Sequence, residues 1–199
     1  MTNAYKQFLS KYISLNRLEW EMIQSRLQVI EYQKGDTIHP IGDVPDTLLF
    51  MNHGLARASI LDENGKDYTW SIFFNDQHSH MSNLFVIDYD SFIRQTPSQL
   101  DIEALEDCQC VASSYEDIQF FYTHLKKGER FGRLMAEEAY SFLHNVFIER
   151  QSKSARERFE IFMETTPHLL EKVPQYHIAS YLGITPQHLS RLKRDHRRS

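Results

Sequence analysis

The side chains best suited to binding a large polar partner lie at the end of the chain. Hydroxyl, amide, imidazole and guanidinium groups recur there at the spacing of one helix face, in Thr185, Gln187, His188, Ser190, Arg191, Arg194, Arg197 and Arg198. Amide and guanidinium groups form paired hydrogen bonds with base edges in the major groove of DNA, and further arginines neutralise phosphates. We therefore predict that this face binds double-stranded DNA, with Gln187 and Arg191 reading bases.

The residues just before this face predict the scaffold that presents it. A helix-turn-helix needs a small residue where its two helices cross and a residue that tolerates left-handed backbone geometry in its turn. Ala179 and Gly183 meet these needs, and Thr185 followed by Pro186 is a typical start of a second helix. The apolar residues at the remaining buried positions are Ile178, Leu182, Ile184, Leu189 and Leu192. Residues 175–199 are thus predicted to form a helix-turn-helix.

Charge is distributed unevenly along the chain. Residues 150–199 carry ten Lys and Arg against five Asp and Glu, so that the whole-chain net charge of −5 leaves −10 on residues 1–149. An acidic body with a basic end predicts that only the end meets a polyanion. A basic C-terminal helix can also be simply solvated, since cations there favour the helix dipole. The spacing of small and apolar residues before it favours DNA binding.

The preceding sequence predicts helices followed by a β module. Residues 4–27 carry apolar side chains at helical spacing, which indicates one or two amphipathic helices. From residue 28 onward, short alternating or β-branched stretches are separated by turn residues, and Asn64-Gly65 is typical of a tight hairpin. Residues 75–99 are irregular, and alternation returns over residues 100–114. This pattern predicts an antiparallel β module.

A helical pattern then runs from about residue 117 to about residue 150, with an apolar stripe along it. The stripe can pack on its own β module or pair with the same helix of a second chain. We predict a homodimer whose interface contains Phe131, Leu134, Met135, Phe142, Leu143 and Val146. The polar segment from residue 151 is the predicted boundary, which divides the chain into a sensor (1–125), a dimerisation helix (126–150) and a DNA-binding domain (151–199).

This order of elements resembles the Crp/Fnr family of bacterial transcription regulators. The most specific match covers residues 178–191, which are similar to the family's signature around its turn and second helix. The resemblance implies an α+β fold with an N-terminal double-stranded β-roll of the cyclic-nucleotide-binding type. It also implies base contacts at Pro186, Gln187 and Arg191, of which only Arg191 keeps the family's residue. The operator sequence should therefore differ from the family's usual one.

The resemblance also implies a cassette for a cyclic phosphate between residues 74 and 98. This sequence lacks the cassette's Gly-Glu pair and has Pro97 where the family has an arginine, so the charge-assisted anchor for a phosphate is missing. Arg94 lies nearby and could substitute for it. Arg94, Pro97 and Ser98 are the candidate effector pocket, and we expect an effector other than cyclic AMP.

Several other classes of function lack the residues they require. Cys108 and Cys110 are too close for an ordinary disulfide and too few for a zinc or iron–sulfur site, and we expect two strand thiols. His78 and His80 lack a nearby third ligand, so no metal site is predicted. No catalytic motif and no cofactor-binding motif occurs, which predicts a protein that is not an enzyme. Without a long apolar run or a signal peptide, we expect a cytoplasmic protein and no membrane partner.

The sequence therefore predicts a homodimeric, sequence-specific transcription regulator with an unknown effector and RNA polymerase as a further candidate partner. The alternative is a ligand-binding module that acts through a protein partner without specific DNA binding. The two hypotheses differ in the salt dependence of DNA affinity, because phosphate contacts release counterions and weaken steeply as salt rises.

Overall fold

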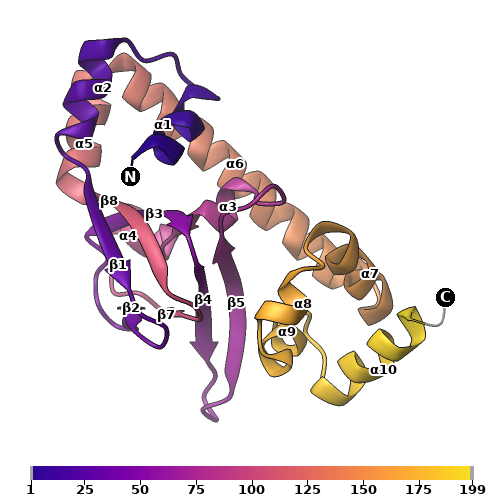
Figure 1. Ribbon diagram of the computed structural model, residues 1–199. Helices are drawn as coiled ribbons and strands as arrows, with labels where there is room; N and C mark the ends of the chain where they lie inside the picture. Colours follow the sequence, from indigo (N-terminus) through magenta and orange to yellow (C-terminus); the bar gives the residue numbers. More distant parts are fainter. Residues whose placement is uncertain (1, 198–199) are drawn as a thin grey trace.

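The computed structural model describes residues 2–197, so that Arg198, a predicted DNA contact, lies outside the described residues (Figure 1). The helices in chain order are α1 (Asn3–Ser10), α2 (Arg17–Gln24), α3 (Met81–Leu84), α4 (Tyr89–Arg94), α5 (Tyr115–His124), α6 (Lys126–Ser152), α7 (Ala155–Thr165), α8 (Leu169–Lys172), α9 (Gln175–Tyr181) and α10 (Pro186–His196). The strands are β1 (Gln28–Tyr32), β2 (Thr37–His39), β3 (Thr47–His53), β4 (Leu55–Leu61), β5 (Asp67–Phe74), β6 (Phe85–Val86), β7 (Asp101–Ala104) and β8 (Cys108–Ser114).

Two four-stranded antiparallel sheets form a β-roll after the N-terminal helices. Their strand orders are β1-β8-β3-β6 and β2-β7-β4-β5. Successive side chains of a strand face opposite ways, so alternate residues of both sheets point into the roll. The buried cluster that they form contains Leu49, Met51, Ala56, Ala58, Phe73, Val86, Leu100, Ile102, Ala104, Cys108, Cys110 and Ala112. The roll, the long helix α6 and the C-terminal helices confirm the predicted α+β fold class.

Local signals predicted two details of the roll correctly. Gly65 lies in the turn between β4 and β5, has a φ of +74° and donates its amide to the Asp62 carbonyl at 2.9 Å. Cys108 and Cys110 lie on β8 as buried free thiols. Strands β2 and β6 were not predicted, because with three and two residues they are too short to show an alternating pattern.

Gly54, between β3 and β4, occupies a position where only glycine fits. Its φ is +110°, and a Cβ atom there would lie 2.6 Å from the Asp107 carbonyl oxygen and 2.7 Å from the Cα of Cys108. We expect Gly54→Ala to lower the free energy of unfolding by about 2 kcal/mol or more, because backbone strain and a steric clash both act. Urea denaturation of the purified protein measures this loss.

Gly42→Ala is the matched control for that substitution. Gly42 also has a left-handed backbone, with φ of +90°, but its Cβ would meet no atom within 4 Å. The control should lose only the conformational strain, about 1 kcal/mol. Equal losses in the two variants would contradict the close approach at Gly54.

The helical pattern after the roll is divided between α5 and α6. The break falls at Leu125, whose backbone is extended with φ of −124° and ψ of 111°. Gly128 then passes so close to the Phe121 carbonyl that a side chain at this position would clash. The uninterrupted pattern from residue 117 therefore does not correspond to one helix. Helix α6 itself starts at Lys126 and continues two residues beyond residue 150.

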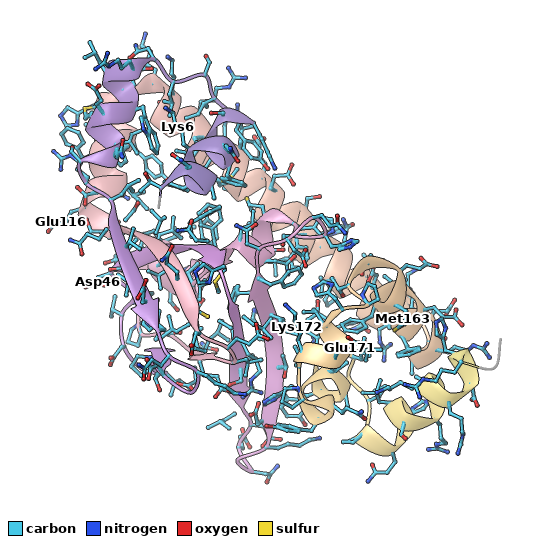
Figure 2. The ribbon with its side chains drawn as sticks, in the orientation of Figure 1. Lys6, Asp46, Glu116, Met163, Glu171 and Lys172 are labelled. Carbon is cyan, nitrogen blue, oxygen red and sulfur yellow. The ribbon has the colours of Figure 1, made fainter. Side chains whose placement is uncertain are left out.

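Helices α7 to α10 lie beside the outer face of the β2-β7-β4-β5 sheet, and α9 packs directly against β5 (Figure 1). Leu55, Ile72 and Phe74 of that face share one buried cluster with the C-terminal helices. The helix residues in this cluster and its adjoining turns are Phe159, Phe162, Leu169, Val173, Ile178, Ala179, Leu182, Leu189 and Leu192. Figure 2 labels Glu171 and Lys172 of α8, where side chains fill the space beside β5. The C-terminal helices thus share their core with the roll.

The chain enters α7 through a short link after α6. Lys153 is extended, and Ser154 starts α7 with a capping box in which its side chain accepts from the Glu157 amide. The predicted boundary at residue 151 thus lies next to a helix end, whereas the apolar cluster beyond it extends into the sheet. Within residues 2–197, no helix combines the length and the apolar composition needed to cross a membrane.

Candidate nucleic-acid interface

Helices α9 and α10 are joined by a tight turn whose geometry follows the sequence signals. Gly183 has a φ of +68°, in the left-handed region that the turn was predicted to need. The Thr185 hydroxyl accepts a hydrogen bond from the His188 amide at 3.2 Å, and Pro186 is the first residue of α10. Both predicted features of the helix start are confirmed, since the cap satisfies an amide that has no partner within the helix.

The crossing of α9 and α10 is tightly packed. Ala179 is fully buried, and its carbonyl accepts the Ile184 amide at 2.9 Å. Leu189 and Leu192 of α10 point into the same cluster as Ile178 of α9. Because the apolar residues of α10 are held inside, its polar residues are turned outward.

The outward face of α10 carries the predicted DNA contacts. Six of them are exposed and His188 is half-buried; the exposed residues are Thr185, Gln187, Ser190, Arg191, Arg194 and Arg197. Among the described residues, Arg191, Arg194 and Arg197 form no ion pair with an acidic side chain. Helix α10 lies on the side of the C-terminal helices remote from the sheet (Figure 1). The structure therefore presents unneutralised guanidinium groups on one open helix face.

Arg158 was not predicted as part of this region, yet it fixes the turn. Its Nε donates to the Leu182 carbonyl at 3.1 Å and its Nη1 donates to the Lys153 carbonyl at 2.6 Å. The side chain thus joins the turn between α9 and α10 to the link after α6. No sequence signal could identify this role, because both acceptors are backbone carbonyls that any residue type supplies.

The three residues of the predicted effector pocket do not converge on one site. Arg94 is exposed and forms an ion pair with Asp90 at 2.9 Å on the same helix. Pro97 is exposed, whereas the buried Ser98 hydroxyl donates to Asp88 at 2.9 Å. Arg94 thus has a local partner and lies at the surface, which corrects the prediction that it could replace a buried phosphate anchor.

A cavity of about 230 Å³ lies between the roll, α5 and α6. Its lining is largely apolar and aromatic, including Phe92 and Phe131, and its only charged members among the described residues are Asp88 and Asp90. No lysine, arginine or histidine of residues 2–197 lines it. A phosphate would therefore meet carboxylates and apolar surface, which oppose the burial of an anion.

We expect cyclic AMP to leave the melting temperature of the protein unchanged. A ligand that binds the folded state raises the melting temperature by mass action, and this cavity offers no cation to hold the cyclic phosphate. Differential scanning fluorimetry with and without cyclic AMP measures the shift, with duplex DNA as a second ligand for comparison. A dose-dependent rise with cyclic AMP would contradict the expectation.

The N-terminal half of α6 packs within its own chain. Met135 is only 7% exposed and, with Phe131 and Leu134, joins the cluster around Phe8 and Trp20 of α1 and α2. The predicted dimer interface is corrected at Met135, which its own chain covers, because the helical period marks an apolar face without identifying its partner. Phe142 and Val146 are half-buried, and of the six predicted residues only Leu143 is exposed.

The C-terminal half of α6 carries a different apolar surface, which we call the exposed stripe. It consists of Tyr140, Leu143 and Phe147, which are 72%, 49% and 61% exposed. Their spacing of three and four residues is that of a coiled-coil seam. Large apolar side chains in such a row are typical of a surface that a partner covers.

Two histidines considered as metal ligands have other surroundings. His78 stacks on the His168 ring with centroids 5.7 Å apart, and His80 lies at the start of α3. Across residues 2–197, no three His, Cys, Asp or Glu side chains come together as a metal-binding group.

No protein-family model and no curated protein sequence matches the chain. Solved structures do match it: FixK2 from Bradyrhizobium japonicum superposes over 85% of this chain and 83% of its own, with a TM-score of 0.69 and 14% identity. A candidate transcriptional regulator of the Crp/Fnr family from Eubacterium rectale has a TM-score of 0.65 and 20% identity, covering 90% and 82%. A CooA mutant from Carboxydothermus hydrogenoformans gives 0.64 and 16%, covering 88% and 78%. At these identities the likeness establishes a shared fold.

Proposed function

We propose that the protein is a homodimeric, sequence-specific DNA-binding regulator of transcription of the Crp/Fnr type, without catalytic activity. The observation that carries this proposal is the outward face of α10, where exposed arginines that form no ion pair within residues 2–197 follow Gln187 on a capped, closely packed helix. A helix of this kind fits the major groove with its N-terminal residues toward the bases. The shared fold with the candidate transcriptional regulator from Eubacterium rectale supports the same function.

Two side chains of α10 are proposed to read bases. Gln187 and Arg191 are four residues apart, which places them on the same helix face one turn from each other. A guanidinium can donate two hydrogen bonds to guanine, and an amide can both donate to and accept from adenine. Pro186 carries no side-chain donor or acceptor, so the preceding position adds no such contact. Arg194 and Arg197, together with Arg198 from the sequence, are proposed to bind phosphates.

The dimer is proposed to form through the exposed stripe of α6. In a two-fold dimer each residue of such a stripe meets the same surface of the other copy, so Tyr140, Leu143 and Phe147 would cover one another. The two α10 helices would then read two half-sites with inverted symmetry. We propose RNA polymerase as the second macromolecular partner of the DNA-bound dimer, and an effector without a phosphate for the roll.

The direct test is to select binding sequences from random duplex DNA at one fixed salt concentration. We expect enrichment of a pseudo-palindrome with half-sites about one helical turn apart. The affinity for the selected duplex should fall steeply as salt rises, because several phosphate contacts release counterions. A failure to enrich any sequence, with weak and salt-insensitive binding, would instead favour a module that acts through a protein partner.

A further inference from the structure

Arg57 of β4 lies at the junction between the outer face of the sheet and α9. Its side chain is 4% exposed, although it is a permanent cation. Nη1 and Nη2 donate to the two carboxylate oxygens of Asp67 at 2.8 and 2.7 Å. Nε and Nη2 donate to one oxygen of Glu103 at 2.9 and 2.6 Å. Two carboxylates of the sheet thus hold the guanidinium in one orientation.

Nη1 also contacts the Thr69 hydroxyl of β5 at 3.3 Å, and a further contact of this guanidinium crosses to the DNA-binding helices. Nη1 of Arg57 lies 2.6 Å from Nδ1 of His177, which is on α9 and is itself buried. A guanidinium is only a donor, so Nδ1 must accept, and the imidazole must be neutral with its proton on Nε2. If Nδ1 were protonated, an N–H group of His177 and one of Arg57 would point at each other, and two positive charges would repel at this distance. The contact therefore requires an unprotonated His177.

A second hydrogen bond joins the same two parts of the chain. The Thr69 amide of β5 donates to the Ser180 hydroxyl of α9 at 2.8 Å. Strand β5 is at the edge of its sheet, so this amide, which bonds outward to α9, has no neighbouring strand to pair with. Its hydrogen bond exists only while α9 is docked on β5.

The charged and titratable groups that face the His177 ring come from four elements. They are Arg57 of β4, Asp67 of β5, Glu103 of β7 and, within α9, Tyr176, whose ring centroid is 3.9 Å away. Burial, followed by the positive charge of Arg57, lowers the pKa of His177 below its ordinary 6.5, while the two carboxylates oppose this shift. Docked His177 is thus harder to protonate than a histidine in water.

We propose that Arg57 is a positioning residue that docks the DNA-binding helices on the roll through His177. The proposal rests on the proposed function and adds a mechanism of regulation to it. In the docked arrangement the outward face of α10 is open, and each recognition helix of a dimer has a fixed place. Rigidly held helices engage two half-sites together, whereas released helices must be ordered on binding and bind less tightly.

Docking is linked to pH with a defined sign. The docked state binds fewer protons than the released state, because the pKa of His177 is lowered only when it is docked. Docking is therefore complete above about pH 6.5, the ordinary value for histidine, and weakens as the pH falls below it. Between 6.5 and the lowered pKa, the docking equilibrium constant falls about tenfold per pH unit.

Hydrogen exchange of the Thr69 amide tests the docking without using DNA. We expect the protection factor of this amide to fall up to about tenfold per unit as the pH is lowered below 6.5. The Val111 amide, in the central strand β8, reports on the roll itself and should keep its protection. Protection of Thr69 that does not change with pH would overturn the proposal.

Two variants separate docking from folding. His177→Gln keeps a neutral acceptor for Arg57 and cannot be protonated, so Thr69 should stay protected across the whole pH range. Arg57→Met should lose the protection of the Thr69 amide at every pH. If this variant also loses the protection of the Val111 amide, its roll has unfolded. In that case the comparison of wild type with His177→Gln tests the role of His177 in docking. The same pH dependence in wild type and His177→Gln would overturn the role of His177.

DNA affinity supplies the functional readout. For the selected palindrome, the wild-type affinity should fall below pH 6.5 more steeply than that of His177→Gln, while an isolated half-site should show the same pH dependence with both proteins. If neither protein binds any duplex, the proposed function fails and hydrogen exchange still tests the docking. If both proteins bind the palindrome with the same pH dependence, docking does not regulate DNA binding. This inference then fails, while the proposed DNA-binding function stands.

Discussion

Arg191→Ala should weaken binding to the selected duplex by about 5- to 150-fold, equivalent to about 1–3 kcal/mol, and should relax the sequence preference at one base pair of each half-site. Arg191 is exposed and has no ion-pair partner within residues 2–197. Its removal therefore leaves no buried charge behind and should not change the stability of the fold. Fluorescence anisotropy at one fixed salt concentration, with single base-pair substitutions in the duplex, measures both effects.

Arg194→Ala is the comparison that separates base recognition from phosphate binding. A phosphate contact weakens binding almost equally for all sequences and lowers the slope of log affinity against log salt by about one. Arg17→Ala, on α2 at the other end of the protein, removes another exposed arginine, one that pairs with Glu21, and should change neither quantity. If Arg191→Ala weakens all sequences equally, Arg191 binds a phosphate and does not read a base.

The double substitution Leu143→Glu and Phe147→Glu should convert the proposed dimer into monomers. These side chains lie in the exposed stripe, and in a two-fold pair four carboxylates would face one another across the seam. Taking such charges out of water without partners costs several kcal/mol, which exceeds what the lost apolar contacts alone would cost. Sedimentation velocity measures the change in mass.

Leu18→Glu serves as the control because Leu18 is also an exposed apolar residue, but on α2. It should leave the dimer intact. Monomeric wild-type protein at working concentrations, or a double variant that remains a dimer, would exclude the exposed stripe as the interface. As a monomer, the double variant should also bind the palindrome no better than a single half-site, since no second α10 helix is joined to the first.

The parts of the fold that depend on neighbouring residues were predictable from the sequence. Thr185 and Pro186 determine where α10 begins through a hydrogen bond and a fixed φ within one helical turn. Gly183 marks the turn because most other residues avoid its backbone conformation. Asn64-Gly65 marks the hairpin for the same reason. Each of these signals depends only on residues a few positions apart, so it can be recognised in the sequence alone.

The relations between distant segments were not predictable in this way. Helical periodicity identified an apolar face on α6 but not whether its own chain or a second copy covers it, and Met135 proved to be covered internally. Arg57 and His177 are 120 positions apart, and no sequence pattern links the two. Arg57 follows the alternation of β4, in which every second residue faces outward, and an outward-facing residue is typically exposed to water. Only the docking of α9 makes it buried.

The effector region illustrates a third limit. The absence of an arginine at Pro97 was visible in the sequence, but the position of Arg94 was not. Its side chain pairs with Asp90 one helical turn away and lies at the surface. A substitute anchor for a phosphate needs a cationic side chain that also points into the pocket. The sequence shows the residue type but not the direction of the side chain.

The apolar cluster that the outer face of the sheet shares with the C-terminal helices has a consequence for genetics. Leu55, Ile72 and Phe74 belong to the roll by sequence, yet they support the helices that carry the proposed DNA contacts. A screen for loss of operator binding should therefore recover substitutions on β4 and β5 as well as on α10. Their phenotype would resemble that of a damaged DNA contact, although the altered residues lie on the sheet.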